Sequence, residues 1–375
     1  MTRVAAIDLG TNTTRLLVAD VQDGRVEEVA VRERITRLGE GVDARRRLLP
    51  LPIARVRNAL TDYRRELESL GAERVLAVAT SAVRDAENGE AFLGEIEWSY
   101  GFTTQLLTGD EEAALTLRGV GDVSADTLVL DVGGGSTELI MRDRAVSLDV
   151  GSVRLTEQFG EDVDAIAAHV QPLLPDLSPT RAIGVAGTIT SLAALDLALP
   201  AYDRDQVHGH VLTLRAVEQQ LDRLAALPLD ERRKLPALDP ERAPVIVAGA
   251  VIVREVLRRY GLDALEASEH DLLHGVALAA ADLPEPVEGK RQELGRQAGA
   301  GVGNRNLDPA DDVYDMAKAQ QSDCPIIIIT GYPDSEMLDR ILVKGPITVL
   351  KKPLNIERVR ETIRMLGHKD VKAAA

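Results

Sequence analysis

Residues 6–18 read AIDLGTNTTRLLV, and residues 129–141 read VLDVGGGSTELIM. Aligning the two aspartates also aligns two glycines, two threonines and two leucines: Asp8 with Asp131, Gly10 with Gly133, Thr14 with Thr137, and Leu16 with Leu139. Each stretch is an apolar strand, an aspartate, a glycine-rich polar turn and a second strand. A chance likeness of two plain hairpins explains neither the aspartates nor the clustered hydroxyls. The sequence therefore predicts two halves, each with the same strand–turn–strand unit near its start.

Glycine-rich turns of this kind are suited to phosphate. Glycines let the backbone approach an anion, successive N–H groups form an anion-binding concavity, and hydroxyl or amide side chains add donors. The turn residues predicted to bind phosphate are Gly10, Thr11, Asn12, Thr13, Gly133, Gly134, Gly135, Ser136 and Thr137. A carboxylate beside such a turn would repel phosphate unless a cation lay between them. Asp8 and Asp131, with Glu138 as a third group, are therefore predicted to face Mg²⁺ directly or through water.

Strands and helices alternate along the first three quarters of the chain, which predicts an α/β fold. Strands are expected at 4–9, 15–20, 26–32 and 75–79, and apolar residues at helical spacing predict a helix over 52–71.

The chain changes character after residue 283. Residues 284–307 begin with Pro-Glu-Pro, are polar and glycine-rich, and are predicted to be a disordered linker. Residues 308–375 then show an αβαβα pattern, with helices expected at 312–321, 335–344 and 355–366 and strands at 325–330 and 347–350.

Composition narrows the class of protein. The chain has 375 residues and a formal net charge of −16, an acidic excess that argues against nucleic acid as a partner. No apolar run approaches the roughly 20 residues of a membrane-spanning helix, so no membrane partner is expected. A single cysteine, Cys324, excludes an intrachain disulfide and suits a reducing compartment. These features predict a cytoplasmic protein.

The two turns, together with motifs between and after them, carry a family resemblance. The chain resembles the exopolyphosphatase/guanosine pentaphosphate phosphatase family of the actin-like/sugar-kinase superfamily over about residues 3–283. Besides the two turns, the similar stretches are RLGEGVD at 37–43, ATSAVRDAENGEAF at 79–92, TGDEEAALTLRGV at 108–120, VSLDVGSVRLTE at 146–157, GVAGTITSLAAL at 184–195, VHGHVLT at 207–213 and SEHDLLHGVAL at 268–278. The resemblance implies two actin-like (ribonuclease H-like) lobes around a cleft, at 1–122 and 123–283, with Mg²⁺ or Mn²⁺ as the cofactor.

The resemblance also implies a catalytic residue. In the family, a glutamate of a G-x-E-E-A motif is the base that activates water, and the matching residue here is Glu112. Taken without the resemblance, Glu111 and Glu112 read as the acidic first turn of an ordinary helix. Arg84 is a candidate phosphate clamp, or else forms a surface salt bridge with Asp85 or Glu87. Gly187 and Thr188, which also match the family, are either phosphate-binding or a plain turn between a strand and a helix.

Two histidine pairs have a weaker interpretation. His270 and His274 stand four residues apart and so share a helix face, as in many metal sites. Because the sequence shows no third ligand, a helix cap or a packed histidine is the preferred interpretation. His208 and His210 also lack an obvious partner.

The segment 308–368 resembles the second half of a response-regulator receiver domain, with Thr330 and Lys352 at the positions that help to place an acyl phosphate. The half that would carry the phosphate-accepting aspartate is missing, so a phosphorylation switch is not supported. A fusion without a native role is preferred over a docking segment or a degenerate adaptor.

These inferences predict an exopolyphosphatase that removes terminal phosphate from polyphosphate, with Glu112 as the base. One alternative is a guanosine pentaphosphate phosphohydrolase acting on penta- or tetraphosphate alarmones. An ATP-dependent kinase on the same fold and a non-catalytic polyphosphate or alarmone sensor are rivals from other classes. A homodimer is compatible with every one of these functions.

Overall fold

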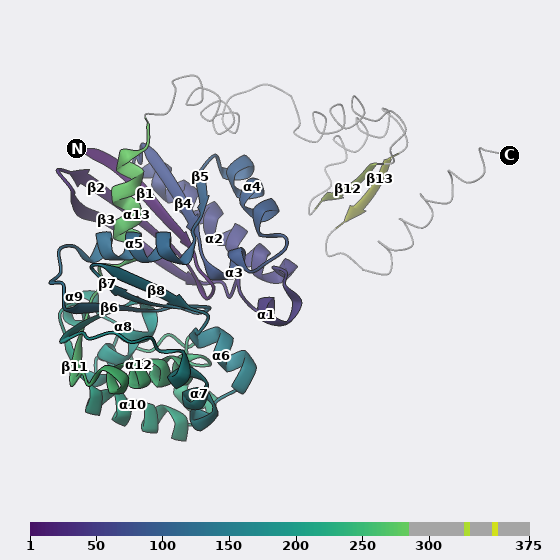
Figure 1. Ribbon diagram of the computed structural model, residues 1–375. Helices are drawn as coiled ribbons and strands as arrows, with labels where there is room; N and C mark the ends of the chain where they lie inside the picture. Colours follow the sequence, from purple (N-terminus) through teal and green to yellow (C-terminus); the bar gives the residue numbers. More distant parts are fainter. Residues whose placement is uncertain (285–325, 331–346, 352–375) are drawn as a thin grey trace. The chain divides into compact units, whose positions relative to one another are not determined.

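The computed structural model describes residues 1–284, 326–330 and 347–351. The chain divides into two compact units, Met1–Arg291 and Gln292–Ala375. The first unit contains two mixed β-sheets with helices on their faces (Figure 1), which confirms the predicted α/β class.

The first sheet has five strands in the order β3-β2-β1-β4-β5. β2 is antiparallel to both β1 and β3, whereas β1, β4 and β5 run parallel. Its strands are β1 (Thr2–Leu9), β2 (Thr13–Gln22), β3 (Arg25–Ile35), β4 (Arg74–Ala79) and β5 (Thr103–Leu106). The strands expected at 4–9, 15–20, 26–32 and 75–79 are therefore confirmed, with small differences at their ends.

The second sheet has six strands in the order β10-β11-β9-β6-β7-β8. β8, β7 and β6 are antiparallel neighbours, and β9 and β11 then continue the sheet parallel to β6. The first sheet has the same arrangement, with β3, β2 and β1 antiparallel and β4 and β5 parallel to β1. The strands of the second sheet are β6 (Thr127–Val132), β7 (Thr137–Met141), β8 (Arg144–Leu148), β9 (Arg181–Val185), β10 (Val211–Thr213) and β11 (Ala264–Ala267). The repeat seen in the sequence is thus a repeat of sheet topology.

Strand alternation decides which helices cover each face of the first sheet. Ala5, Ile7 and Leu9 of β1 pack against α2 and α4, whereas Val4 and Ala6 point to the opposite face. The helices of this region are α1 (Val42–Arg45), α2 (Pro50–Ser69), α3 (Ser81–Arg84), α4 (Gly89–Tyr100) and α5 (Gly109–Val120). Helix α2 confirms the helix expected over 52–71.

The opposite face of the first sheet is covered by the last helix of the unit, α13 (Leu272–Asp282). Helix α5 lies between α13 and strands β7 and β8 of the second sheet, so both helices occupy the layer between the sheets (Figure 1). The two helices cross closely: a Cβ on Gly119 would overlap the backbone of Asp271, and one on Gly275 would overlap Leu115. The lobe boundaries at residues 122 and 283 stay a prediction, but α13 packs on the sheet of the first half.

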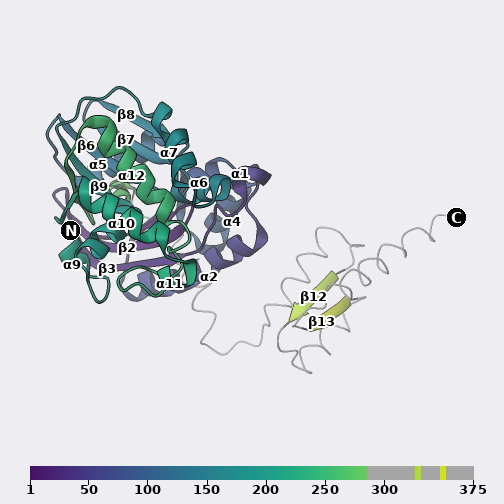
Figure 2. The same cartoon turned by 90° about the horizontal axis from the view of Figure 1, so that it is seen from below.

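The outer face of the second sheet packs on the largest apolar cluster, in which α10 and α12 lie against each other (Figure 2). The remaining helices are α6 (Ser152–Phe159), α7 (Val163–Val170), a short 3₁₀ helix (Gln171–Leu173), α8 (Ala186–Asp196), α9 (Arg204–Val207), α10 (Leu214–Ala226), α11 (Leu229–Arg232) and α12 (Ile246–Tyr260). No helix in the described part of the chain is long and apolar enough to cross a bilayer.

In the second unit, β12 (Ile326–Thr330) and β13 (Ile347–Lys351) form a parallel pair. These strands match the ones expected at 325–330 and 347–350. Apart from Pro284, the linker predicted at 284–307 lies outside the described residues. The three helices expected at 312–321, 335–344 and 355–366 also lie outside them, as do Cys324 and Lys352. The resemblance to a receiver domain therefore stays a prediction.

Arg232 is a fully buried arginine that joins three segments of the second lobe. Its guanidinium pairs with Glu161 and donates to the carbonyls of Leu224, Leu227 and Ala243. Replacing Arg232 leaves buried acceptors unpaired, so Arg232→Ala is expected to lower the free energy of unfolding by about 3 kcal/mol.

The neighbouring Arg233 is the matched control. Its contact with Asp230 is exposed, so Arg233→Ala is expected to change stability by less than about 0.5 kcal/mol. Urea denaturation followed by circular dichroism compares the two variants, and equal midpoints would contradict the assigned role of Arg232.

Candidate active site

The two predicted turns have the same hairpin geometry. In the first, Leu9 is paired with Thr14 and the Gly10 N–H donates to the Thr13 carbonyl at 2.9 Å. In the second, Val132 is paired with Thr137 and the Gly133 N–H donates to the Ser136 carbonyl at 3.0 Å. Because the two hairpins have the same strand register, corresponding side chains point in the same direction. Asp8 and Asp131 therefore occupy equivalent positions beside their turns.

The two turns lie against each other. A Cβ on Gly134 would come 3.1 Å from the Thr11 Cβ, and one on Gly135 would overlap the Ser81 hydroxyl and lie 2.8 Å from the Thr11 hydroxyl oxygen. The missing side chains of these glycines permit the close approach of the second turn to Thr11 and Ser81. The two turns that are predicted to bind phosphate therefore form one surface.

Arg154 of α6 holds this contact from the side. Its Nε donates to the Gly135 carbonyl at 2.7 Å, and its other nitrogens pair with Asp43 of α1 and with Asp85, the C-cap of α3. The side chain thus links the second turn to two helices of the first lobe.

Four carboxylates converge between the sheets. Because Leu9 and Val132 face the outer helices, alternation turns Asp8 and Asp131 toward the inner layer. Glu138 of β7 faces the same layer, and Glu112 projects from the first turn of α5. None of the four is more than 7% exposed.

Burial of these like charges shifts their pKa values. Desolvation, followed by repulsion from neighbouring carboxylates, raises the pKa of Asp131 and of Glu112 well above the ordinary range. Desolvation also raises the pKa of Glu138, although the Ser147 hydroxyl donates to it at 2.8 Å.

A divalent cation fits this donor set. The cluster consists of oxygen ligands only, which suits Mg²⁺ or Mn²⁺, and Asp8 Oδ1 is buried with no hydrogen-bond partner among the described residues. A bound cation would offset the mutual repulsion of the carboxylates. We therefore find the residues present compatible with the expected metal, whose identity is not fixed by the donor set.

Glu111 and Glu112 have different roles in the fold. Glu111 and Thr108 form a capping box, in which hydrogen bonds from the Thr108 backbone and hydroxyl lower the pKa of Glu111. Glu112 is buried and lines the cavity beside the two turns. The alternative interpretation, that both glutamates are the acidic first turn of an ordinary helix, therefore fits Glu111 but not Glu112.

The turns and carboxylates line a cavity of about 70 Å³. The predicted residues on its wall are Asp8, Gly10, Thr11, Asn12, Thr13, Glu112, Asp131, Gly133, Gly134, Gly135, Ser136, Gly187 and Thr188. Gly187 and Thr188 belong to the first turn of α8, whose N-terminus suits an anion.

Three predicted residues do not line this cavity. Thr137 is buried and donates to the Val150 carbonyl, and Glu138 is buried opposite Asp131 in the β6–β7 pair. Arg84 donates to the Leu107 carbonyl at 2.7 Å and forms an ion pair with Glu112 at 3.4 Å. Among the described residues it pairs with neither Asp85 nor Glu87, the two alternative partners. The roles of Thr137, Glu138 and Arg84 in phosphate or metal binding stay predictions.

Sequence reasoning did not single out Arg15, although it stands directly opposite Asp8 in the hairpin. Arg15 donates to Asp8 Oδ2 at 2.9 and 3.0 Å and to Asp271, the N-cap of α13. Burial opposes ionisation of Asp271, but Arg15 and His274 outweigh it and hold the pKa of Asp271 well below its usual range. The hairpin register could have revealed Arg15, whereas nothing local pointed to Asp271.

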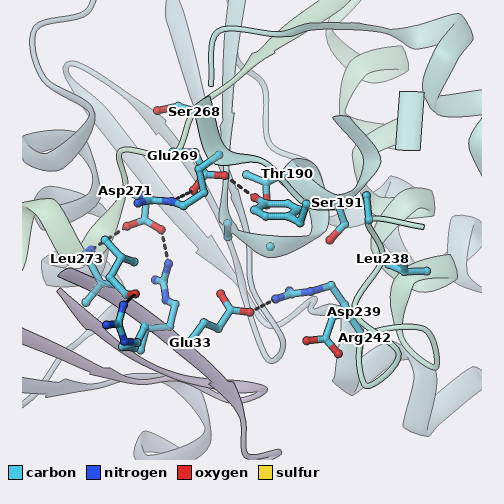
Figure 3. Close-up of a pocket in the computed structure, with 18 of the residues that line it drawn as sticks. Glu33, Thr190, Ser191, Leu238, Asp239, Arg242, Ser268, Glu269, Asp271 and Leu273 are labelled. Atoms are coloured by element: carbon cyan, nitrogen blue, oxygen red, sulfur yellow. Dashed lines mark hydrogen bonds and ion pairs between the residues drawn. The ribbon is translucent and has the colours of Figure 1, made fainter. Parts of the chain in front are cut away.

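A second, larger pocket of about 600 Å³ adjoins the cavity. The residues shared by both are Arg15, Glu33, Ala186, Gly187 and Arg242. Glu33 of β3 and Arg242 of the second lobe point toward each other and form an ion pair (Figure 3). Beyond this pair the wall becomes mixed apolar and polar, with Leu238, Tyr202 and Thr190.

Two sheets of one topology, with glycine-rich turns meeting over buried carboxylates in a cleft, define an enzyme of actin-like architecture. The chain belongs to the Ppx/GppA phosphatase family, whose sequence pattern matches residues 17–283. It is therefore a phosphatase of the hydrolase class.

Relatives support the assignment. Exopolyphosphatase 2 of Mycobacterium tuberculosis is 39% identical over 316 residues, covering 75% of this chain and 99% of the relative. The guanosine-5'-triphosphate,3'-diphosphate pyrophosphatase of Vibrio vulnificus is 30% identical, covering 83% of this chain and 68% of the relative. The crystal structure of the Aquifex aeolicus member of the Ppx/GppA family has a TM-score of 0.63 at 32% identity, covering 75% of this chain and 97% of that one.

The carboxylate cluster predicts a pH-dependent response to Mg²⁺. Because the folded-state pKa values of Asp131 and Glu112 are raised, the stability of the metal-free protein falls as pH rises from the ordinary carboxyl range through the raised values. Mg²⁺ would bind the ionised groups, so the Mg²⁺-induced rise in melting temperature should grow over the same window.

Thermal unfolding with and without Mg²⁺, from acidic to alkaline pH, measures this rise. Asp131→Asn should flatten its pH dependence, whereas Asp122→Asn, at a position 96% exposed, should not. A rise that is independent of pH in the wild type would contradict a cation at this cluster.

Proposed function

We propose that this protein is a Mg²⁺-dependent exopolyphosphatase that hydrolyses the terminal phosphate of inorganic polyphosphate, with Glu112 as the general base. The observation that carries the proposal is the buried Glu112 on the wall of a cavity formed by two opposed phosphate-type turns. The similarity to a mycobacterial protein named as an exopolyphosphatase, over that protein's whole length, supports the choice of substrate.

The chain's own residues have distinct tasks in this reaction. Backbone N–H groups and hydroxyls of the two turns bind the terminal phosphoryl group. Glu112 orients a water molecule and accepts its proton as the water oxygen attacks phosphorus and the bridging P–O bond breaks. Burial raises the pKa of Glu112, which makes its carboxylate a stronger base. When bound, Mg²⁺ supplies charge neutralisation for the phosphate oxygens.

A bound cation at the carboxylates, together with nearby arginines, would make a polyanion acceptable despite the net charge of −16. Arg15 and Arg242 both stand on the cavity wall, and Arg84 lies behind Glu112. Net charge governs long-range encounter, whereas these arginines act at contact distance.

The base is tested by a pair of neighbouring variants. Glu112→Gln should lower phosphate release from long-chain polyphosphate by about 100-fold or more, because the carboxylate that takes the proton is lost. Glu111→Gln, which changes the exposed capping residue, should retain most activity. Phosphate release with Mg²⁺ and no nucleotide measures both.

Each outcome separates the rival functions. Equal loss in both variants would indicate a damaged helix start rather than a missing base. Binding of polyphosphate without turnover in the wild type would favour the non-catalytic sensor, and a strict requirement for ATP would favour a kinase.

Guanosine pentaphosphate is a second candidate substrate, favoured by the adjoining pocket. A linear polyphosphate has no group that needs a partly apolar space of about 600 Å³ beside the phosphate turns. A nucleoside has such a group, and a relative from Vibrio vulnificus is named for a guanosine tri- and diphosphate substrate.

Filling the pocket distinguishes the two substrates. Ala201 lines the large pocket but not the small cavity. Ala201→Trp should raise KM for guanosine pentaphosphate by about 10-fold or more and leave turnover of polyphosphate unchanged. Ala201→Ser is the matched control, and an equal loss on both substrates would contradict a separate nucleoside pocket.

A further inference from the structure

The fold supplies a third metal-type ligand to the histidine pair that the sequence left incomplete. His274 lies in the first turn of α13, and His270 precedes that helix. Glu28 comes from β3 of the first sheet. One ligand atom from each of these three residues lies within 4.8 Å of the other two.

The spacing is close to that of a bound ion. His274 Nε2 lies 2.9 Å from Glu28 Oε1, and the ring centroids of His270 and His274 are 4.5 Å apart. Two ligand atoms on one tetrahedral Zn²⁺ lie about 3.4 Å apart, so side-chain rotations of about 1 Å would close the site. Two imidazoles and one carboxylate are a donor set that selects Zn²⁺ or a similar transition metal over Mg²⁺.

Burial and neighbours suit a site that is anchored but accessible. His274 is buried, whereas His270 and Glu28 are open to solvent. In this structure His274 Nδ1 accepts the Asp271 N–H at 3.4 Å, which leaves the ring proton on Nε2, facing Glu28. Metal binding at Nε2 would move this proton to Nδ1, which lies 3.9 Å from the Asp271 carboxylate. A carboxylate beside that nitrogen orients a metal-binding imidazole. No ring nitrogen of His270 is engaged by a hydrogen bond from the described residues, so its lone pair is available.

His208 packs on His270 without being a ligand. Its ring centroid is 4.7 Å from that of His270, and its Nδ1 accepts the Glu269 N–H at 3.2 Å. The neutral ring therefore carries its proton on Nε2. His208 holds the position of His270 and leaves three protein ligands for the ion.

Arg204 is the competitor for this site. Its guanidinium donates to both oxygens of Glu28, at 2.7 and 3.0 Å, and to Glu269 at 2.8 Å. A cation must share Glu28 with this arginine, while Glu269 offsets part of its charge. Removing the positive charge of Arg204 should therefore strengthen metal binding.

We propose that Glu28, His270 and His274 form a binding site for a transition-metal dication of the Zn²⁺ type, separate from the active-site carboxylates. Asp271 and Arg15 stand between the two sites, because Asp271 neighbours His274 and Arg15 joins Asp271 to Asp8. The ion would tie β3 of the first sheet to the start of α13.

The test uses the full chain, stripped of metal and then held in excess Mg²⁺ to occupy the carboxylate cluster. Titration with Co²⁺ should give one equivalent of a visible absorption band of tetrahedral type, which Zn²⁺ then displaces. Glu28→Gln and His270→Ala should each weaken binding at least about 10-fold. Glu27→Gln and His169→Ala are matched controls that should keep it.

Arg204→Gln supplies the opposite prediction, since it should tighten Co²⁺ binding by about 10-fold or more. His270 is exposed, so its variant should fold, and circular dichroism checks this. Absence of a saturable band in the wild type, or a band unchanged by both Glu28→Gln and His270→Ala, would overturn the proposal.

Discussion

Repulsion among four buried carboxylates is the constraint on which the rest of this structure depends. Asp8, Glu112, Asp131 and Glu138 come from different elements and share one space between two sheets. Such an arrangement is costly unless opposite charge is present. Arg15 offsets part of the charge at Asp8, and a bound cation would offset the remainder. The tight glycine contacts keep the carboxylates from separating.

Much of the fold could be predicted because it follows from short-range pattern. The repeated strand, aspartate, glycine turn and strand specify both hairpins, and β-strand alternation then directs Asp8 and Asp131 to the same inner layer. The different roles of Glu111 and Glu112 could not be predicted from residue type alone. They depend on a capping box that turns one carboxylate back to the helix start and leaves the other facing the cavity.

Contacts between distant segments could not be predicted in this way. Asp271 approaches Arg15, Glu28 approaches His274, and Arg242 approaches Glu33 only when α13 and the second lobe are in place. Each of these pairs joins residues far apart in the chain, so no local sequence pattern predicts it. The contact of Glu28 with the histidine pair and the wall of the large pocket have this same origin.

The position of α13 has a consequence for biosynthesis. One face of the first sheet, including Val4, Ala6 and Leu17, is covered by a helix at residues 272–282. A ribosome therefore makes that sheet early but releases its cover only after the whole second lobe has been translated. Until then the nascent chain carries an open apolar surface, of the kind that chaperones bind. The first lobe thus cannot complete its folding as an independent, vectorial step.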